Sequence, residues 1–259
     1  MFKRVIAFAF ILVFVLSSSA FAGRFDFAIL QPGQPGTTAE AQPVMDEFAG
    51  YLSAKLGEKV QGVYYNDLNE ALAYLKKDKP AWAICGLTFF KSYSSEFSMT
   101  PVASTLPQGM RKDVWRLIVP ANGPDSPEAV QGKVYGSMLY TPQSREILFE
   151  GKKDGDFSVE GTHKALRMLR KVNKGKVSGV VLDAVQYSVI KDSDRYSGTK
   201  VIYASPELPN SPVVWFGNTN DDAFRLQSVL LDMDKDPAAK DLLKLLQTSG
   251  FNPADKDLK

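Results

Sequence analysis

The chain has 259 residues, 44% of them hydrophobic, with 31 Lys and Arg against 29 Asp and Glu, one Cys and one His. This length predicts about two domains. The single cysteine excludes an internal disulfide, and the single histidine excludes a multi-histidine zinc site, so we expect no metal and no cofactor. Because the charges nearly balance, the chain lacks the excess of basic residues that is typical of a nucleic-acid-binding protein. The one basic cluster, at residues 164–176, has helical spacing and is interpreted as a solvated face.

The N-terminal residues have the three-part pattern of a secretory signal peptide. Lys3 and Arg4 precede twelve apolar residues, and Ala20-Phe21-Ala22 follows as an A-x-A cleavage site. The apolar run is shorter than the ~20 residues that span a bilayer. We therefore predict a signal peptide over residues 1–22, cleavage after Ala22 and a periplasmic protein. Cleavage leaves 29 cations and 29 acids, so the mature chain is formally neutral.

The mature chain begins with alternating strand and helix signals. Apolar residues at spacings of three and four predict a helix that begins at Thr37 or Thr38 and ends before Gly57, and a second helix that begins after Asp67. Three apolar runs predict strands, at 25–30, 60–65 and 81–86. This β-α-β-α-β order predicts a mainly parallel sheet covered by helices.

A breaker cluster at residues 120–124 follows two extended runs, at 101–106 and 114–119, and is interpreted as a crossing between domains. A second α/β unit is predicted beyond it. Its elements are strands at 134–138 and 179–182 and helices at 143–150, 162–172 and 184–190.

The last part of the chain is interpreted as a return to the first unit. The chain runs through 200–204 into 205–212, whose three prolines are expected to forbid regular structure. A strand at 213–216 and two helices that open at Asp221 and Asp236 follow. The second of these helices is expected to bury Leu242, Leu243, Leu245 and Leu246.

These elements predict an α/β protein of two lobes, a hinged clamshell with two crossovers. The predicted first lobe comprises residues 23–119 and 205–259, and the second comprises 120–204. Ligands of such sheets bind beyond the carboxyl ends of the strands. The residues there are rich in hydroxyls, amides and glycines, which together with the N–H groups of helix starts bind anions without Lys or Arg. We therefore expect a small oxyanion as ligand.

Several motifs, in their shared order, resemble a known family. Gly161-Thr162-His163, followed by Ala165, Leu166, Gly175, Val177 and Asp183, is similar to the second-lobe pattern of phosphonate/phosphate/phosphite substrate-binding proteins of ABC transporters. The runs 201–209 and 211–215 look like the segment by which that family returns to its first lobe, and 83–86 resembles its strand and loop with ligand contacts. The resemblance implies a type II periplasmic-binding fold. It also implies an oxyanion held by hydroxyls and N–H groups at a second-lobe helix start, helped by a histidine.

Position by position, His163 matches the family histidine and the 140–144 loop matches the hydroxyl-rich loop. That loop reads Thr141-Pro142-Gln143-Ser144 where the family has Ser-Thr-Ser-Gly, so one N–H donor is lost at the proline. Ser211 stands where aminophosphonate binders present an acidic group, which makes an amine-bearing ligand less expected. The predicted ligand contacts are Tyr65, Gly86, Thr88, Tyr140, Thr141, Gln143, Ser144, His163, Asp183 and Ser211.

Several of these residues also have simpler interpretations. Thr141, Ser144 and Asp183 are also candidates for helix caps. His163 on its own is typical of a surface histidine. Cys85 ends an apolar strand, where a buried inert thiol is commoner than a nucleophile.

The leading hypothesis is a non-enzymatic, monomeric periplasmic receptor that delivers a small anion to an ABC permease. A receptor that reports its ligand to a membrane sensor is the alternative within binding proteins. A third hypothesis is an enzyme on the same fold, with Cys85 as nucleophile and His163 as general base. The last is an assembly protein whose cleft is collapsed and filled with side chains.

Overall fold

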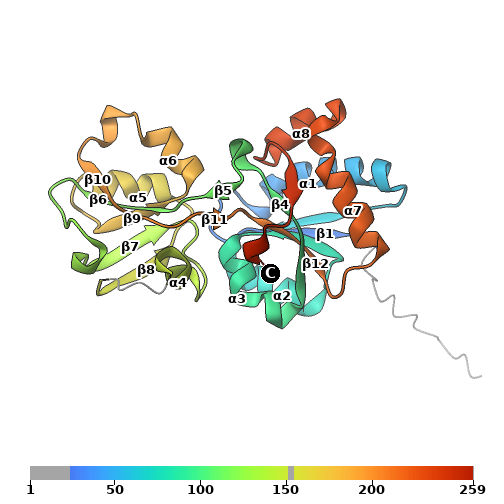
Figure 1. Cartoon of the computed structure of the whole chain (residues 1–259), viewed down its shortest axis with the longest axis horizontal. Coiled ribbons are helices and arrows are strands. Elements are labelled where there is room, and N and C mark those ends of the chain that lie inside the picture. The colour runs from blue at the N-terminus through green and yellow to red at the C-terminus, as the bar shows by residue number, and fades with distance from the viewer. Residues whose placement is uncertain (1–23, 151–154, 259) are drawn as a thin grey trace, which may run out of the picture.

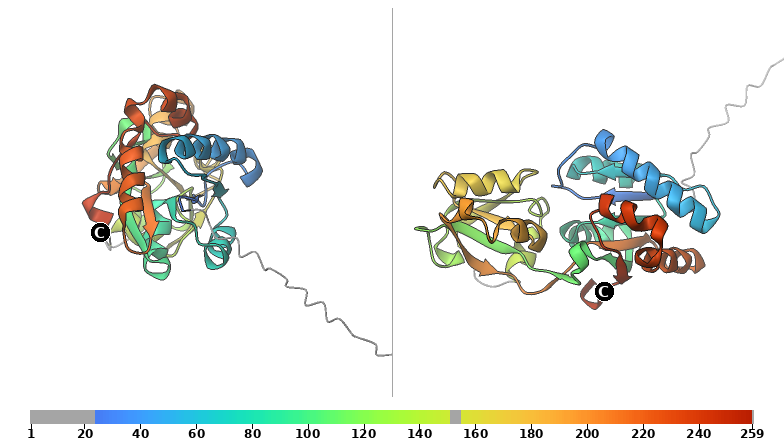
Figure 2. Two further views of the ribbon diagram at one scale, coloured as in Figure 1. Left: turned by 90° about the vertical axis from the view of Figure 1, so that its right-hand side faces the viewer. Right: turned by 90° about the horizontal axis from the view of Figure 1, so that it is seen from above.

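The computed structural model describes residues 24–150 and 155–258, which form two lobes joined by two extended segments (Figure 1). The predicted signal peptide lies outside the described residues. Seen from above, the two lobes lie side by side and the connecting segments run between them (Figure 2). This is the predicted two-lobed α/β architecture.

The first lobe contains a six-stranded sheet in the order β13-β4-β12-β3-β1-β2. Strand β1 is parallel to both β2 and β3, as the β-α-β-α-β pattern predicts, whereas β12 and β13 are antiparallel to their neighbours. The bounds are β1 Phe27–Leu30, β2 Gly62–Tyr65, β3 Trp82–Cys85, β4 Met99–Thr105, β12 Pro212–Phe216 and β13 Phe251–Pro253. The last strand was not predicted.

Five helices cover this sheet, and the termini of the first two follow the sequence signals. Thr37 caps α1 by accepting a hydrogen bond from the Glu40 N–H, and Gly57 ends α1 in the left-handed conformation that favours glycine. Asp67 caps α2 in the same way as Thr37 caps α1. The helices are α1 Thr38–Leu56, α2 Leu68–Lys77, α3 Leu87–Phe97, α7 Asp221–Leu231 and α8 Lys240–Leu245.

Two predictions in this lobe were wrong. Helix α3 was missed because its Phe- and Ser-rich sequence lacks a clear start signal, and it begins at Gly86 with no side-chain cap. Leu245, the last residue of α8, is 48% exposed rather than buried. Leu242 and Leu243 are buried, and Leu246 is partly buried against the same cluster.

The second lobe contains a five-stranded sheet in the order β10-β6-β9-β7-β8. Its bounds are β6 Arg116–Pro120, β7 Gly132–Gly136, β8 Phe157–Gly161, β9 Gly179–Leu182 and β10 Thr199–Ala204. Helices α4 Ser144–Phe149, α5 Ala165–Val172 and α6 Ala184–Ile190 connect these strands. Strands β8 and β10 were absent from the sequence prediction. The polar alternation of β8, Phe-Ser-Val-Glu-Gly, gives a weak signal.

The crossing between lobes is not where the breaker cluster predicted it. Strand β6 already belongs to the second sheet, so the chain has crossed before Arg116. The breaker cluster at 120–124 instead forms the turn after β6, where the Gly123 N–H donates to the Pro120 carbonyl at 2.8 Å. The two connecting segments pair at the hinge, β5 (Lys112–Asp113) with β11 (Leu208–Pro209). The prolines of the return segment thus permit a two-residue strand, at an edge where the missing N–H is tolerated.

Short 3-10 turns complete the fold, at Pro107–Gly109, Pro127–Ala129, Asp194–Tyr196, Met233–Lys235, Pro237–Ala239 and Lys256–Leu258. The apolar core has three clusters. One lies wholly in the first lobe, around the rings of Phe27, Phe48 and Trp82, and one lies in the second lobe. The third runs through both lobes and includes Trp115 and Leu208 beside the hinge.

Candidate functional site

The carboxyl ends of three first-lobe strands form one side of the candidate site. Leu30 pairs with Tyr65 and with Cys85, so β1, β2 and β3 end at the same edge. The Gly86 N–H donates to the Leu30 carbonyl at 3.1 Å, and α3 starts there. A Cβ added to Gly86 would meet nothing within 4 Å. The space beside Gly86, at the uncapped start of α3, is therefore open.

The loop after β1 is held by one amide side chain. Asn66 Nδ2 donates to the Gln34 carbonyl at 2.9 Å and to the Gly36 carbonyl at 2.7 Å. Tyr65, directly before Asn66, packs its ring against Tyr74, and burial raises the pKa of its phenol. The predicted first-lobe contacts Tyr65, Gly86 and Thr88 thus lie along a single, fixed edge.

The second lobe supplies the opposite side from the same end of its parallel strands. Gly136 pairs with Gly161 and with Val181, so the loop after β7, the loop after β8 and the start of α6 lie together. The rings of Tyr140 and His163 are 5.3 Å apart between centroids. A Cβ on Gly161 would lie 2.5 Å from the Tyr140 ring, so glycine is required for this packing.

The two sides touch through residues that the sequence placed in the site. Thr141 Oγ1 donates to the Thr88 carbonyl at 3.1 Å, and both residues are buried. His163 Nδ1 lies 2.9 Å from the Gln34 carbonyl. A Cβ on Gly33 would lie only 1.9 Å from the Ser137 carbonyl oxygen. The structure is therefore a closed form in which loops of the two lobes are in direct contact.

The Thr141–Ser144 loop is rigid and largely satisfied by its own hydrogen bonds. The Thr141 N–H donates to Ser144 Oγ at 3.2 Å, Ser144 Oγ donates to the Met138 carbonyl at 3.0 Å, and Ser144 is fully buried. Helix α4 has no side-chain cap, so neither Thr141 nor Ser144 has the cap role that was the simpler interpretation. Gln143 Oε1 is buried and has no hydrogen-bond partner among the described residues.

Asp183 caps α6 by accepting a hydrogen bond from the Gln186 N–H at 2.7 Å. Burial and the neighbouring Asp113 carboxylate raise the pKa of Asp183 to about 6. Asp113 accepts from the Ala184 N–H at 2.8 Å, and burial raises its pKa as well. Two partly buried carboxylates therefore meet where the hinge strand β5 touches the second lobe.

Ser211 lies apart from these contacts. Its carbonyl accepts hydrogen bonds from the Thr105 N–H at 3.0 Å and from Thr105 Oγ1 at 3.3 Å, at the start of β12 in the first-lobe sheet.

Four residues of this region were not among the predicted ligand contacts: Gly33, Gln34, Asp113 and Gln186. Gln186 Nε2 donates to Ser137 Oγ at 2.8 Å, and Gln34 acts through its carbonyl. The strand-end rule marks the segments 31–38 and 183–187, which contain Gly33, Gln34 and Gln186, without selecting a residue, and no signal pointed to Asp113.

Comparison with known families decides what this clamshell is. The model of a family described as "ABC transporter, phosphonate, periplasmic substrate-binding protein" matches residues 35–258. The chain belongs to this family. It is therefore a periplasmic solute-binding protein of the phosphonate-binding family, whose partners are a small ligand and an ABC transporter. No curated protein matches the sequence.

Solved structures of similar fold agree with this membership. The Xanthomonas citri protein XAC2383 bound to chloride ion has a TM-score of 0.72 at 16% identity over 90% of this chain and 92% of its own. The same protein bound to ATP has a TM-score of 0.69 at 15% identity, with the same coverage. PhnD1 from Prochlorococcus marinus in complex with methylphosphonate has a TM-score of 0.60 at 15% identity over 91% and 94%. At these identities the likeness shows the type II periplasmic-binding fold.

The geometry does not favour the enzyme hypothesis for this family member. Cys85 is fully buried, its Sγ lies 4.0 Å from the Pro212 carbonyl, and burial raises the pKa of the thiol. His163 is engaged with Gln34 instead. Within the described residues, no group of three or more His, Cys, Asp and Glu side chains is placed to hold a metal ion. None of the described helices is long and apolar enough to span a membrane.

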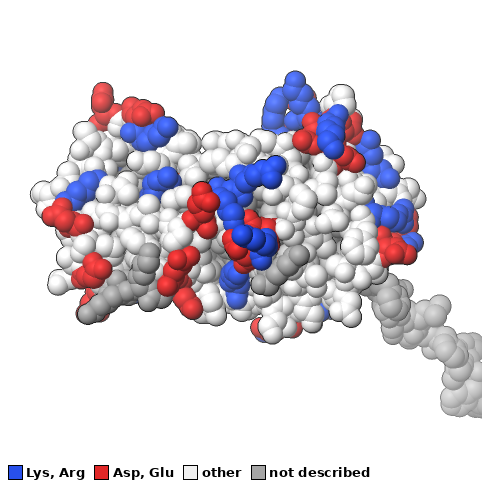
Figure 3. All heavy atoms as spheres, viewed as in Figure 1, with Lys and Arg blue, Asp and Glu red and all other residues white. Residues whose placement is uncertain are grey.

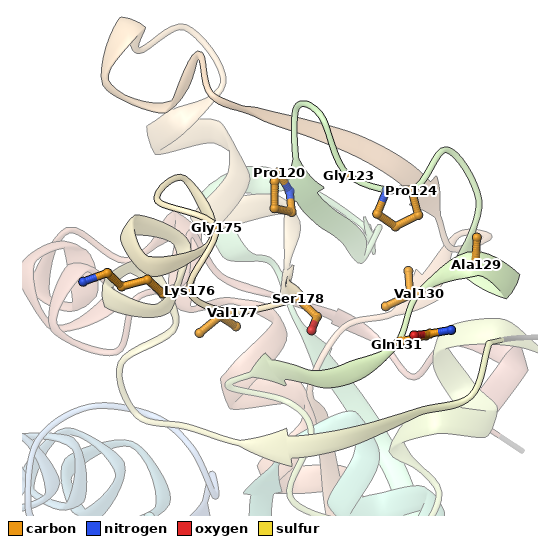
Figure 4. A pocket seen from close by; sticks show the side chains of 10 residues that line it. All are labelled: Pro120, Gly123, Pro124, Ala129, Val130, Gln131, Gly175, Lys176, Val177 and Ser178. Carbon is orange, nitrogen blue, oxygen red and sulfur yellow. The ribbon is translucent and has the colours of Figure 1, made fainter.

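Two surface cavities of this binding protein lie away from the candidate site. One, of about 360 Å³, is lined by residues that include Pro120, Gln131 and Ser178, and Figure 4 shows Lys176 pointing away from the other lining side chains. It lies at the amino ends of β7 and β9, the edge opposite the one where ligands of such sheets bind. The other lies between α6 and β10 and is lined by residues that include Tyr187 and Tyr196.

Proposed function

We propose that this protein captures a small phosphonate- or phosphate-like oxyanion between its two lobes for uptake by an ABC transporter. The observation that carries the proposal is the meeting of Thr141 with Thr88 and of His163 with Gln34 at the carboxyl ends of both sheets. These are hydrogen-bonding groups without a formal charge, which matches a formally neutral mature chain whose anion specificity comes from local geometry.

The proposed mechanism uses groups from both lobes. Thr141 Oγ1 exchanges its bond to the Thr88 carbonyl for a ligand oxygen. The start of α3, which has no side-chain cap, offers backbone N–H groups from the first lobe. His163 supplies a further donor at the rim. Because the donors come from both lobes, a bound oxyanion stabilises the closed form over the open one.

The tight contact of Gly33 with Ser137 and Tyr140 supports a small ligand rather than a nucleotide. The methylphosphonate bound to the Prochlorococcus marinus relative is in keeping with this size. The remaining parts of the proposal are cleavage of the signal peptide after Ala22 and a monomeric state. Tyr65, Tyr140, Gln143, Ser144, Asp183 and Ser211 remain proposed contacts around the core of Thr88, Thr141, Gly86 and His163.

A thermal-shift panel tests the proposal. It includes phosphate, phosphite, methylphosphonate, 2-aminoethylphosphonate, sulfate, carboxylates and ATP. A ligand at 100 times its dissociation constant adds about 2.7 kcal/mol of stability, which raises the Tm measurably. The oxyanion proposal is contradicted when none of the phosphorus or sulfur oxyanions shifts the Tm while an unrelated metabolite does.

Thr141→Val then locates the site of any hit. Loss of a hydrogen bond to a charged ligand costs about 1.5–3 kcal/mol, roughly a tenfold to hundredfold loss of affinity. Thr199→Val is the matched control, because Thr199 Oγ1 also donates to a carbonyl, that of Tyr196 at 2.8 Å, but at the far end of the second lobe. If Thr141→Val and Thr199→Val changed the ligand affinity equally in calorimetric titrations, Thr141 would not contact the ligand.

A further inference from the structure

Helix α5 divides cleanly into a buried face and a charged face. Ala165, Leu169 and Val172 are buried in the second-lobe core. The other side, continued by the turn after the helix, carries six exposed cations, here called the α5 ridge: Lys164, Arg167, Arg170, Lys171, Lys174 and Lys176. Three of them, Arg167, Arg170 and Lys171, lie within α5 at spacings of three and four, so they share one side of the helix.

The α5 ridge differs from the rest of the surface in having no acidic partners. Residues 161–182 contain no Asp or Glu, and none of the six cations forms an ion pair with another described residue. Elsewhere the two signs are mixed, as the face drawn in Figure 3 shows and as the Lys133–Glu160 pair at 2.8 Å illustrates. In a formally neutral mature chain, this ridge is a local concentration of positive charge.

Such a ridge weakens its own helix. Arg167 and Lys171 are four residues apart and Arg167 and Arg170 three apart, and like charges at these spacings destabilise a helix. A face of this kind is suited to a surface that supplies the missing negative charge. We propose that the α5 ridge is an electrostatic docking surface for the anionic phospholipid headgroups of a membrane.

The composition of the ridge favours lipid headgroups over a protein partner. Protein interfaces are depleted in Lys and are anchored by buried aromatic residues. The ridge has four Lys and no aromatic residue, and its one exposed large apolar side chain is Leu166. Because the apolar face of α5 is buried in the lobe, nothing inserts, and adsorption is peripheral and reversible. Each cation near an anionic membrane surface contributes about a fivefold factor to the partition coefficient.

The position of the ridge gives such docking a purpose beyond the proposed ligand capture. The first turn of α5 follows His163, which contacts the first-lobe loop through Gln34. The right-hand view of Figure 2 shows α5 along the outer face of its lobe, with this end next to the loop before α1. Adsorption through the ridge therefore keeps the rim of the binding site near the membrane that holds the transporter.

Vesicle co-sedimentation tests the proposal. The probes are vesicles of equal parts phosphatidylcholine and phosphatidylglycerol, and vesicles of phosphatidylcholine alone. At about 0.01 M ionic strength, where the Debye length is about 30 Å, we expect binding to the anionic vesicles only, and at about 1 M we expect it to be lost. The double variant R167E/K171E should bind at least about tenfold more weakly.

The matched control is K59E/K240E, which changes the charge by the same amount at two exposed lysines outside the ridge. It should bind as the unaltered protein does. Equal binding by R167E/K171E and K59E/K240E, or no preference for anionic vesicles, overturns the proposal. If the protein shows no preference for anionic vesicles, the α5 ridge is a solvated face or binds a protein. Circular dichroism of R167E/K171E confirms that the helix is retained, and ligand affinity should be unchanged, so this test stands apart from that of the ligand.

Discussion

The two lobes meet in two regions of opposite character, the hinge and the rim of the candidate site. At the hinge, the contacts are made to a charged and partly buried group: Trp115 Nε1 donates to Asp113 at 2.8 Å, and Asp113 accepts from the Ala184 N–H. At the rim, contacts are single hydrogen bonds made by neutral groups, such as Thr141 to the Thr88 carbonyl. A hydrogen bond to a charged group contributes about 1.5–3 kcal/mol net, whereas a neutral one contributes only about 0.5–1.5 kcal/mol.

This difference shows which contacts persist when the protein opens. The hinge contacts join the connecting strand to the lobe that it enters, so they remain when the lobes separate. The rim contacts join one lobe to the other, so opening breaks them. Changes at the hinge should therefore alter the stability of the fold, and changes at the rim should alter ligand affinity and closure.

Trp115→Ala should give the largest effect, on stability. Trp115 is 3% exposed and lies in the apolar cluster shared by both lobes. Its removal should cost about 3–5 kcal/mol in the free energy of unfolding, measured by urea denaturation. Trp115→Phe is the control, since it keeps much of the apolar contact and loses mainly the hydrogen bond to Asp113. A loss below about 1 kcal/mol for Trp115→Ala would mean that the hinge is not a buried, structural contact.

Gly33→Ala should destabilise the closed form by a change at the rim. The added Cβ would collide with the Ser137 carbonyl and the Tyr140 ring of the other lobe. Overpacking of this kind costs about 1–3 kcal/mol, which should appear as weaker ligand binding and as a wider distance distribution in small-angle scattering.

Gly36→Ala is a close control for Gly33→Ala. Gly33 and Gly36 have φ values of 93° and 95°, so alanine is strained equally at both, but a Cβ on Gly36 would meet only Glu40 Oε2 at 3.7 Å. Equal opening in the two variants would show that loop strain, and not the contact between lobes, controls closure.

The sequence was most informative where local rules apply. The caps at Thr37 and Asp67, the helix end at Gly57 and the buried strand at 82–85 each follow from a few neighbouring residues, and the structure has all four. Helix α3 was missed because it begins at Gly86 without a capping side chain. Local signals therefore define most elements and fail where a terminus is left uncapped.

The candidate site was predictable only as a set of strand ends. The rule for parallel sheets selected the loops that carry Thr88 and Thr141, and the family resemblance selected His163. Neither could pair them, because the contacts to Thr88 and Gln34 join residues 53 and 129 positions apart and depend on how the lobes close. The crossing was misplaced for a related reason. A cluster such as 120–124 predicts a turn, and only strand pairing shows whether that turn lies within a lobe or between lobes.

The partly buried pair Asp113 and Asp183 gives the smallest expected effect, a pH dependence that belongs to the hinge alone. The folded-state pKa of Asp183 is raised from 3.8 to about 6, so the folded protein binds this proton more tightly than the unfolded chain does. Stability should therefore rise as pH falls through about 6, and the gain is complete only below the unfolded value.

Between pH 7 and pH 5 this gain is about 1 kcal/mol in the free energy of unfolding, measured by urea denaturation at each pH. Asp183→Asn keeps a capping side chain for α6 but removes the titration, so its stability should change less over the same range. A hinge that opened with the rim would expose both carboxylates to water. Wild type and Asp183→Asn would then have the same pH dependence, and the distinction between a fixed hinge and a reversible rim would fail.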